Sequence, residues 1–293
     1  MGETMDISII IVNYNTPQLT VGAIESILKS KTKYEYEIIV VDNHSSDDSV
    51  HIIKGKFPGI VMIENKKNVG FSKANNQAIK LSKGRYILLL NSDTIVNEDT
   101  IEKMIEFMDK NKEVGASGCQ VVLPSGELDR ACHRGFPTPE ASFYYLIGLA
   151  RLFPKSPRFN RYHLGYMGLS EPHPVDCLVG AFMVVRREVI EQVGLLDEQF
   201  FMYGEDIDWC YRIKKVGWEI YYYPFTTIIH YKGGSSRRKP FKIIYEFHRA
   251  MFLFHRKHYA DKYPLVVNGL VYTGILCKFI LSVIVNIFRK MGG

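Results

Sequence analysis

Three carboxylates stand close together in an aromatic-rich stretch, residues 200–212, of this 293-residue chain. Glu205, Asp206 and Asp208 follow a glycine, which predicts a loop that opens into a helix near residue 205. Acids in a first helical turn face the positive end of the helix dipole, which stabilises their charged form. A carboxylate held ionised in a cleft is suited to general-base catalysis, although acids at this position also simply cap helices.

Alternating apolar segments predict the scaffold on which such a site would lie. Short β-branched runs that are apolar throughout predict strands buried on both faces, at residues 7–12, 37–41, 60–63 and 86–90. Helical spacing separates and follows them, at residues 19–28, 50–53, 72–81 and 99–110. This alternation predicts an α/β fold: a parallel sheet with helices on both faces, whose ligands bind at the carboxyl ends of the strands.

Polar residues gather at those predicted strand ends. The set comprises Asn13, Tyr14, Asp42, Asn68, Gly70, Asn91, Ser92 and Asp93. Asn, Asp and Gly also form turns, so any one of these residues could serve the backbone alone. Because four strand ends carry them together, a binding site is favoured.

The second half of the chain is less regular. The turn-forming sequence PSGE predicts a hairpin between residues 119–123 and 128–132, beside a basic cluster of Arg130, His133 and Arg134. Residues 143–162 form an apolar, then basic, stretch that reads as an insertion over the sheet or as a solvated surface loop.

Strand character returns beyond this insertion. A strand is expected at residues 175–185, and Gly180 inside it is typical of close backbone approach to a ligand or of a bulge. Two further strands are expected at residues 219–223 and 227–230, ending at His230.

Composition narrows the class of protein. The chain is 46% hydrophobic and 23% charged, which is typical of a globular protein with one large domain or two. The net charge of +6 suits a phosphate-bearing ligand or an anionic membrane surface without demanding nucleic acid. Five cysteines without CxxC spacing support neither a zinc site nor a disulfide scaffold, so a reducing compartment is expected, and no signal peptide is apparent.

Several motifs, taken in order, resemble a known enzyme family. They are VNYN at residues 12–15, VDN at 41–43, NVGFSKANNQAI at 68–79, NSD at 91–93, GAFMVVRREV at 180–189 and DEQFFMYGEDIDWCYR at 197–212. Together they resemble the inverting GT-A glycosyltransferases of bacteria, which use nucleotide sugars, and in particular the rhamnosyltransferase-like branch. The resemblance covers residues 7–236 and implies a Rossmann-like mixed sheet flanked by helices.

The resemblance also implies roles for individual residues. Asp206 would be the catalytic base, and Glu205 and Trp209 would contact the acceptor. The donor would be bound by Asn13, Tyr14, Asp42, Asn68, Gly70, Asn75, Asn91, Ser92 and Gly180. Asp93 and His230 would hold a divalent cation, Mg²⁺ or Mn²⁺, with Asn91 standing where the family's DXD-type motif has its first acid.

The implied reaction moves a sugar from a nucleotide-sugar donor, rhamnose from dTDP-rhamnose, to a lipid-linked or polysaccharide acceptor in cell-surface glycan assembly. One alternative is a transferase that uses a UDP-sugar carrying GlcNAc, Gal or Glc. A second is a non-catalytic relative that binds nucleotides or glycans, which Asn91 in place of an acid favours. A nucleotidyltransferase fits less well, because no Gly-rich basic signature lies near the first strand.

We expect the chain to consist of a catalytic domain, residues 1–240, and a C-terminal helical segment, residues 241–293. Within the domain, residues 1–112 would bind the nucleotide and residues 113–240 the acceptor. Residues 264–288 are strongly apolar, but Lys278, Ser282, Asn286 and Arg289 form one polar stripe on a helical wheel. This pattern favours an amphipathic helix lying on the cytoplasmic face of the membrane. The alternatives are contact with a second subunit in a homodimer and a membrane-spanning helix.

Overall fold

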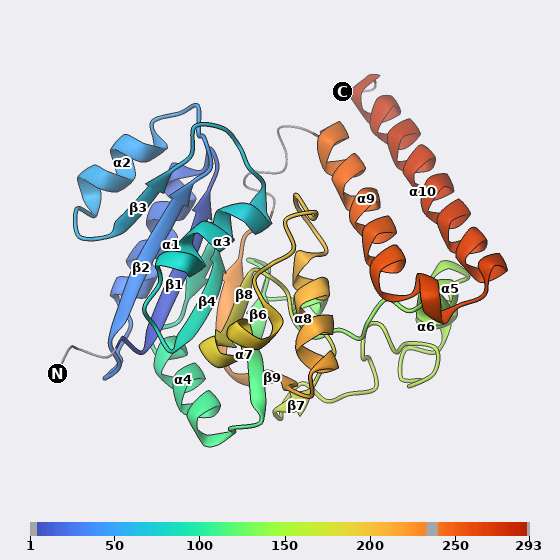
Figure 1. Cartoon of the computed structure of the whole chain (residues 1–293), viewed down its shortest axis with the longest axis horizontal. Helices are drawn as coiled ribbons and strands as arrows, with labels where there is room; N and C mark the ends of the chain where they lie inside the picture. Colours follow the sequence, from blue (N-terminus) through green and yellow to red (C-terminus); the bar gives the residue numbers. More distant parts are fainter. Residues whose placement is uncertain (1–4, 233–239, 292–293) are drawn as a thin grey trace.

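The computed structural model describes residues 5–232 and 240–291. In this part of the chain nine strands form one sheet in the order β3-β2-β1-β4-β8-β6-β9-β5, with β7 paired to β9 (Figure 1). The strands are β1 (Ile7–Asn13), β2 (Tyr36–Asp42), β3 (Val61–Glu64), β4 (Tyr86–Asn91), β5 (Thr94–Val96), β6 (Val114–Val122), β7 (His173–Pro174), β8 (Phe182–Arg186) and β9 (Glu219–His230). The expected mixed α/β sheet is therefore confirmed.

Helices connect the strands and cover the sheet. They are α1 (Pro17–Leu28), α2 (Ser49–Lys56), α3 (Phe71–Leu81), α4 (Thr100–Lys110), α5 (Pro139–Leu146), α6 (Leu149–Leu152), α7 (Arg187–Val193), α8 (Glu205–Lys215), α9 (Pro240–His258) and α10 (Leu265–Met291). Two short 3-10 turns lie at Arg130–Cys132 and Ala260–Lys262.

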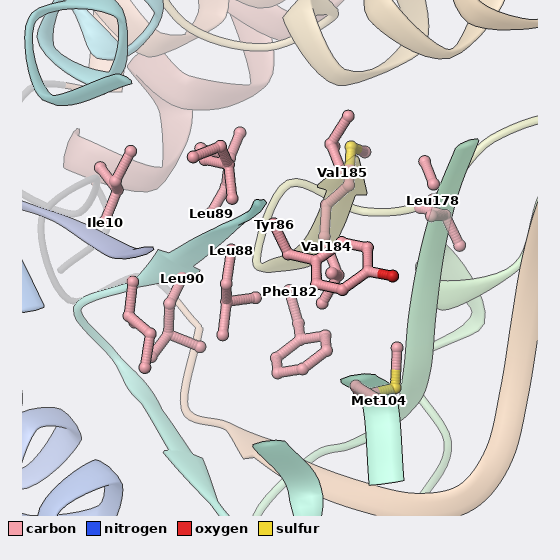
Figure 2. Close-up of a cluster of buried hydrophobic side chains, with 14 of the residues drawn as sticks. Ile10, Tyr86, Leu88, Leu89, Leu90, Met104, Leu178, Phe182, Val184 and Val185 are labelled. Carbon is pink, nitrogen blue, oxygen red and sulfur yellow. The ribbon is translucent and has the colours of Figure 1, made fainter. Parts of the chain in front are cut away.

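The first four strands are parallel and follow the apolar runs of the sequence. The central residues of β1, β2 and β4 are almost entirely buried because helices cover both faces of the sheet, whereas β3, at the edge, is partly exposed. β8 then runs antiparallel to β4, with Leu90 opposite Phe182 and Leu88 opposite Val184. Figure 2 shows the side chains of Leu88, Phe182 and Val184 gathered in the core where these two strands pair. This antiparallel junction joins the two halves of the sheet.

The second half differs from the expected pattern at three places. The expected hairpin is reduced to one bridge, Val122 to Leu128, because the Asp129 side chain accepts from the Ala131 N–H and starts a 3-10 turn instead. The strand expected at residues 175–185 begins only at Phe182. The two strands expected at residues 219–230 are one strand, β9, with a register shift against β6.

β5 crosses from the first half of the chain to the far edge of the sheet. It pairs antiparallel with β9, and Thr94 lies opposite His230. The residues that follow β4 are thereby brought to the end of β9, although the sequence separates them widely.

The C-terminal helices α9 and α10 pack against each other in a hairpin (Figure 1). His255 on α9 lies 2.7 Å from the side-chain oxygen of Asn268 on α10, and this pair is buried. α9 also packs on the rest of the chain, where Ala250, Leu253 and Phe254 form a small core with Phe200.

α10 presents an apolar outer face. Its Lys278 ammonium lies 5.5 Å from the Phe247 ring of α9, so the predicted polar stripe turns partly toward α9. Phe279, which is not part of that stripe, packs against His248 of α9. The side chain of Arg289, the last member of that stripe, lies outside the described residues.

Candidate active site

The dipeptide Gly180–Ala181 connects the end of β4 to the start of α8. The backbone N–H of Asn91 donates to the Ala181 carbonyl at 3.0 Å. The Gly180 N–H donates to Oδ2 of Asp206 at 3.2 Å. A Cβ on residue 180 would lie 3.6 Å from the Asp206 Cβ and 3.9 Å from Oε1 of Glu205. The NSD segment and the acidic start of α8 are therefore both hydrogen-bonded to this dipeptide, which links them.

Asp206 is held from several sides and has a side chain only 13% exposed. Its Oδ2 also accepts from the Arg134 guanidinium at 2.9 Å, and its Oδ1 accepts from the Ile207 N–H at 2.8 Å. Arg134 donates in addition to the Leu178 carbonyl at 2.9 Å. Burial alone would lower the pKa of Arg134, but the Asp206 charge, together with smaller contributions from Tyr162 and Cys177, raises that pKa, so the guanidinium stays charged. The carboxylate is thus oriented by a buried cation.

Glu205 lies beside Asp206 in a different environment. Its side chain is buried, and its Oε2 atom has no hydrogen-bond partner among the described residues. Burial, with a further contribution from the Asp206 charge, raises the pKa of Glu205 well above the ordinary range. A carboxyl group with its pKa raised in this way favours the protonated form near neutral pH, in which it has a hydrogen to donate.

Asp208 and Trp209 point away from this site. Asp208 is fully buried, and its carboxylate lies 2.8 Å from Arg212, 2.7 Å from Lys257 and 2.7 Å from His258. Trp209 is also fully buried and donates its indole N–H to the Gly194 carbonyl at 2.9 Å. This corrects the expected acceptor contact, because a side chain without exposed area cannot touch a substrate.

Asp42, the last residue of β2, is the centre of a hydrogen-bond network. Its Oδ1 accepts from the Asn13 amide at 2.8 Å and from the Ser45 hydroxyl at 2.6 Å. Its Oδ2 accepts from the Ser45 N–H at 2.9 Å. Asn13 is completely buried, so it orients Asp42 rather than touching a ligand itself. Tyr14, the next residue, is half-buried at the end of β1.

The loop after β3 lies against the segment that precedes α8. The Asn43 amide donates to Oδ1 of Asn68 and to the Gly70 carbonyl, both at 3.2 Å. Gly70 has φ +89°, and a Cβ there would approach the Phe201 carbonyl to 2.7 Å, so only glycine fits. Asn75 is buried and donates to the Phe71 carbonyl at 2.9 Å, which corrects the expected donor contact.

The pairing of β5 with β9 brings His230 to the NSD segment. Its Nε2 lies 3.2 Å from Oδ1 of Asp93 and 3.5 Å from the Asn91 amide. Its Nδ1 lies 3.5 Å from Oδ2 of Asp129. Burial alone would lower the pKa of His230, but the neighbouring Asp129 and Asp93 carboxylates raise it. Ser92, in the same segment, has its hydroxyl 3.2 Å from that of Thr16.

Two of these groups suit a cation that is coordinated mainly by substrate. Asp93 and His230 offer a carboxylate and an imidazole side by side, and magnesium sites commonly combine few protein ligands with substrate phosphates. A ligating histidine usually gives its second ring nitrogen to a carboxylate, which is the position of Asp129. Within residues 5–232 and 240–291, no group of three or more His, Cys, Asp or Glu side chains could hold a metal ion by itself.

Comparison with known proteins decides the family. The model of the family described as glycosyl transferase family 2 matches residues 8–194, more than half of the chain. The chain belongs to glycosyl transferase family 2.

Relatives of this family 2 glycosyltransferase include rhamnosyltransferases. N-acetylglucosaminyl-diphospho-decaprenol L-rhamnosyltransferase of Mycobacterium tuberculosis is 24% identical over 238 residues, which cover 78% of this chain and 76% of the relative. Rhamnosyltransferase WbbL of Escherichia coli K12 is 28% identical over 210 residues, covering 69% and 75%.

The fold has solved counterparts. S. aureus TarS, residues 1–349, superposes with a TM-score of 0.58 at 16% identity, covering 94% of this chain and 71% of that one. GalNAc-T7, solved with UDP, GalNAc and Mn²⁺, superposes with a TM-score of 0.58 at 16% identity, covering 79% and 44%. The GT-A architecture expected from the sequence is thereby confirmed.

Three polar residues of the glycosyltransferase site were not predicted. Ser45 lay in a stretch that the sequence marks only as rich in helix-capping residues. Asp129 lay in the expected hairpin strand, and Arg134 stood in a basic cluster without an assigned role. Each is recognised only through its partner, namely Asp42, His230 and Asp206 respectively.

Proposed function

We propose that this glycosyltransferase transfers rhamnose from dTDP-rhamnose, with inversion, to a lipid-linked or polysaccharide acceptor in cell-surface glycan assembly. The observation that carries the proposal is the Gly180–Ala181 connection, which holds Asp206 beside the residues that follow β4. The choice of rhamnose and of a lipid-linked acceptor is supported by the Mycobacterium relative, which is an N-acetylglucosaminyl-diphospho-decaprenol L-rhamnosyltransferase.

Asp206 is assigned as the general base. The acceptor oxygen would attack the anomeric carbon while its proton passes to the Asp206 carboxylate. The bond from that carbon to the diphosphate oxygen would break, and the nucleoside diphosphate would leave with the electron pair. One displacement from the opposite face inverts the configuration. Arg134 and the Gly180 N–H would hold the carboxylate in place during this step.

Glu205 and the donor-side residues have supporting roles in this assignment. The protonated Glu205 carboxyl would donate to an acceptor oxygen. Asp42, oriented by Asn13 and Ser45, would accept from the ring N–H of the base. Tyr14, Asn68, Gly70, Asn91 and Ser92 would line the remainder of the donor.

Asp93 and His230 are the residues that would hold Mg²⁺ or Mn²⁺, with Asp129 orienting the imidazole. Such a cation, when bound with the donor, neutralises charge on the departing diphosphate. The structure of GalNAc-T7 with UDP, GalNAc and Mn²⁺ supports this assignment by analogy of fold.

Residues 241–293 are assigned as the segment that holds the catalytic domain, residues 1–240, at the cytoplasmic face of the membrane. By length and composition, Leu265–Phe288 of α10 could cross a bilayer. The most apolar stretch of this helix is not buried against the rest of the protein. Its Lys278 and the packing against α9 favour a helix that lies along the lipid surface.

A donor panel tests the activity. The full chain is incubated with Mn²⁺, a polyprenyl-diphosphate GlcNAc acceptor and dTDP-rhamnose, UDP-glucose, UDP-galactose or UDP-GlcNAc. We expect glycosylated lipid and nucleoside diphosphate from dTDP-rhamnose alone, and none after chelation. Product from a UDP-sugar would instead establish the alternative donor.

The same panel separates catalysis from binding. A rise in melting temperature with a donor shows that the donor binds the folded chain. Such a rise without release of nucleoside diphosphate from any donor would support the non-catalytic alternative, which the presence of Asn91 in place of an acid favours.

A further inference from the structure

The insertion that carries α5 and α6 exposes an unusual number of large apolar side chains. Six of them define what we term the α5–α6 surface: Phe143, Tyr145, Leu146, Ile147, Leu152 and Phe153. Leu146 is 74% exposed and Leu152 is 69% exposed. By contrast, only Leu28, Val61 and Leu81 are large apolar residues classed as exposed among the described residues before 143. Scattered exposed leucines are normal, but a concentration of this kind marks an interaction surface.

The charge of the insertion indicates the kind of partner. Residues 141–170 contain no Asp or Glu, but they contain Arg151, Lys155, Arg158 and Arg161, all exposed. None of the salt bridges in the described part of the chain uses these four cations. Exposed apolar side chains interleaved with unpaired cations complement an anionic lipid surface.

The α5–α6 surface is continuous with the exposed start of α10. The Tyr263 hydroxyl, two residues before α10, donates to the Glu140 carboxylate of α5 at 3.0 Å. Leu265 and Val266 then open α10 and are 88% and 75% exposed. Figure 1 shows α5 and α6 beside the turn that joins α9 to α10.

The insertion is also anchored at the active site. At its base the Gly135 N–H donates to the Tyr162 carbonyl at 2.9 Å. The residue before Gly135 is Arg134, which holds Asp206. A contact made by the insertion would therefore fix the position of the catalytic carboxylate relative to whatever the insertion touches.

We infer that the α5–α6 surface is a second contact with an anionic bilayer, separate from the contact made by α10. The inference rests on the membrane attachment proposed above and adds a site to it. With two contacts instead of one, the catalytic domain cannot swing freely about α10. The acceptor side of Asp206 is held at the lipid surface, where an acceptor carried on a lipid presents its hydroxyl.

Vesicle flotation with the full chain tests this surface. L146E/L152E carries two charges on the α5–α6 surface, and L28E/L81E carries the same charges at exposed positions elsewhere. On vesicles of phosphatidylcholine with phosphatidylglycerol, we expect L146E/L152E to bind at least tenfold more weakly than wild type, and L28E/L81E to bind unchanged. Equal binding of L146E/L152E and wild type would overturn the inference.

A second variant tests the charge. R151Q/K155Q/R158Q removes three cations, each worth about fivefold in affinity for an anionic surface. We expect weaker binding to the anionic vesicles and unchanged binding to vesicles of phosphatidylcholine alone. Equal loss on both vesicle types would contradict the electrostatic part of the inference.

Further arms distinguish failure of this inference from failure of the proposed attachment. I280E/I284E alters α10 alone. If it abolishes binding while L146E/L152E does not, α10 is the membrane contact and the α5–α6 surface is not. If wild type binds no vesicle, the attachment itself fails. If wild type is a dimer without lipid and L146E/L152E is a monomer that binds vesicles normally, the surface is a subunit contact instead.

Folding is controlled by a measurement that needs no membrane. Transfer to a water-soluble acceptor and the thermal midpoint should be unchanged in L146E/L152E, because neither leucine touches the active site. With the lipid-linked acceptor in anionic vesicles, the same variant should show at least a tenfold lower rate. A variant that loses both activities has lost its fold, and R151Q/K155Q/R158Q then decides the question alone.

Discussion

Asn13, Asp42 and Ser45 form a network in which a neutral amide and a hydroxyl surround one carboxylate. Asn13 and Asp42 end two adjacent parallel strands, and Ser45 lies in the loop that follows the second of them. At α8, by contrast, the Asp206 and Asp208 carboxylates are paired with cations, Asp206 with the largely buried Arg134 and the fully buried Asp208 with Lys257 of α9. Removing one member of a buried ion pair leaves the other uncompensated, whereas a neutral hydrogen-bond partner costs less to lose. The α8 side should therefore respond more strongly to single substitutions than the donor side.

The largest expected effect is on turnover. Asp206→Asn removes the proposed base but keeps a group that can accept from Arg134, so kcat should fall by about 10²–10⁴ while the affinity for nucleotide changes little. Single-turnover kinetics and calorimetric titration of the nucleotide measure the two quantities. A parallel loss of nucleotide affinity would indicate that Asp206 binds the donor, and the α8 acids would then not differ from the Asp42 network in the way proposed.

The next effect is on stability. Asp208→Asn leaves Lys257, His258 and Arg212 without their buried carboxylate, and the free energy of unfolding should fall by about 3–5 kcal/mol. Urea unfolding measures it, with Asp261→Asn on the exposed 3-10 turn as the matched control. Equal stability of the two variants would show that α9 is not held to α8 by charge.

Acid should reveal the same interaction. Burial alone would raise the pKa of Asp208, but His258, Arg212 and Lys257 lower it to about 2. A carboxylate whose folded pKa lies below the unfolded value, about 4, stabilises the fold above pH 4, and that contribution is lost as pH falls toward 2. Wild type should lose about 2–3 kcal/mol more than Asp208→Asn over this range. Parallel unfolding curves of the two proteins between pH 5 and pH 2 would contradict this.

The smallest effect is expected on the donor side. Asp42→Asn keeps the shape of the network but removes one charged acceptor, so nucleotide affinity should fall by about tenfold, near 1.4 kcal/mol, with kcat nearly unchanged. Ser45→Ala should cost less again. If either substitution lowered stability as much as Asp208→Asn, the two sides would not differ in the way described.

The same contrast explains what the sequence could and could not predict. β1, β2 and β4 follow from apolar runs, and the polar residues at their ends follow from the parallel arrangement. The family motifs identified Asp206, Asp93 and His230 as candidates, and the structure brings the last two within hydrogen-bonding reach. These predictions depend on local patterns of a few residues.

Pairings between distant segments were not predictable in this way. Arg134 and Asp206 are 72 residues apart, and the sequence around either residue gives no sign that the two pair. Trp209 and Asn75 lie within genuine motifs, but residue type does not tell which face of a helix is buried, and both turn inward. β5 has only three residues and gains its strand geometry from β9.

The place of β5 also has a consequence for how the chain is made. Residues 94–96 leave the ribosome well before residues 219–230, which must pair with them to complete the sheet. Non-local pairing of this kind forms slowly, because a long loop must close before any contact rewards it. A nascent chain that stops before residue 219 exposes an unpaired strand edge, so truncated products should be cleared or aggregate rather than persist as half-enzymes.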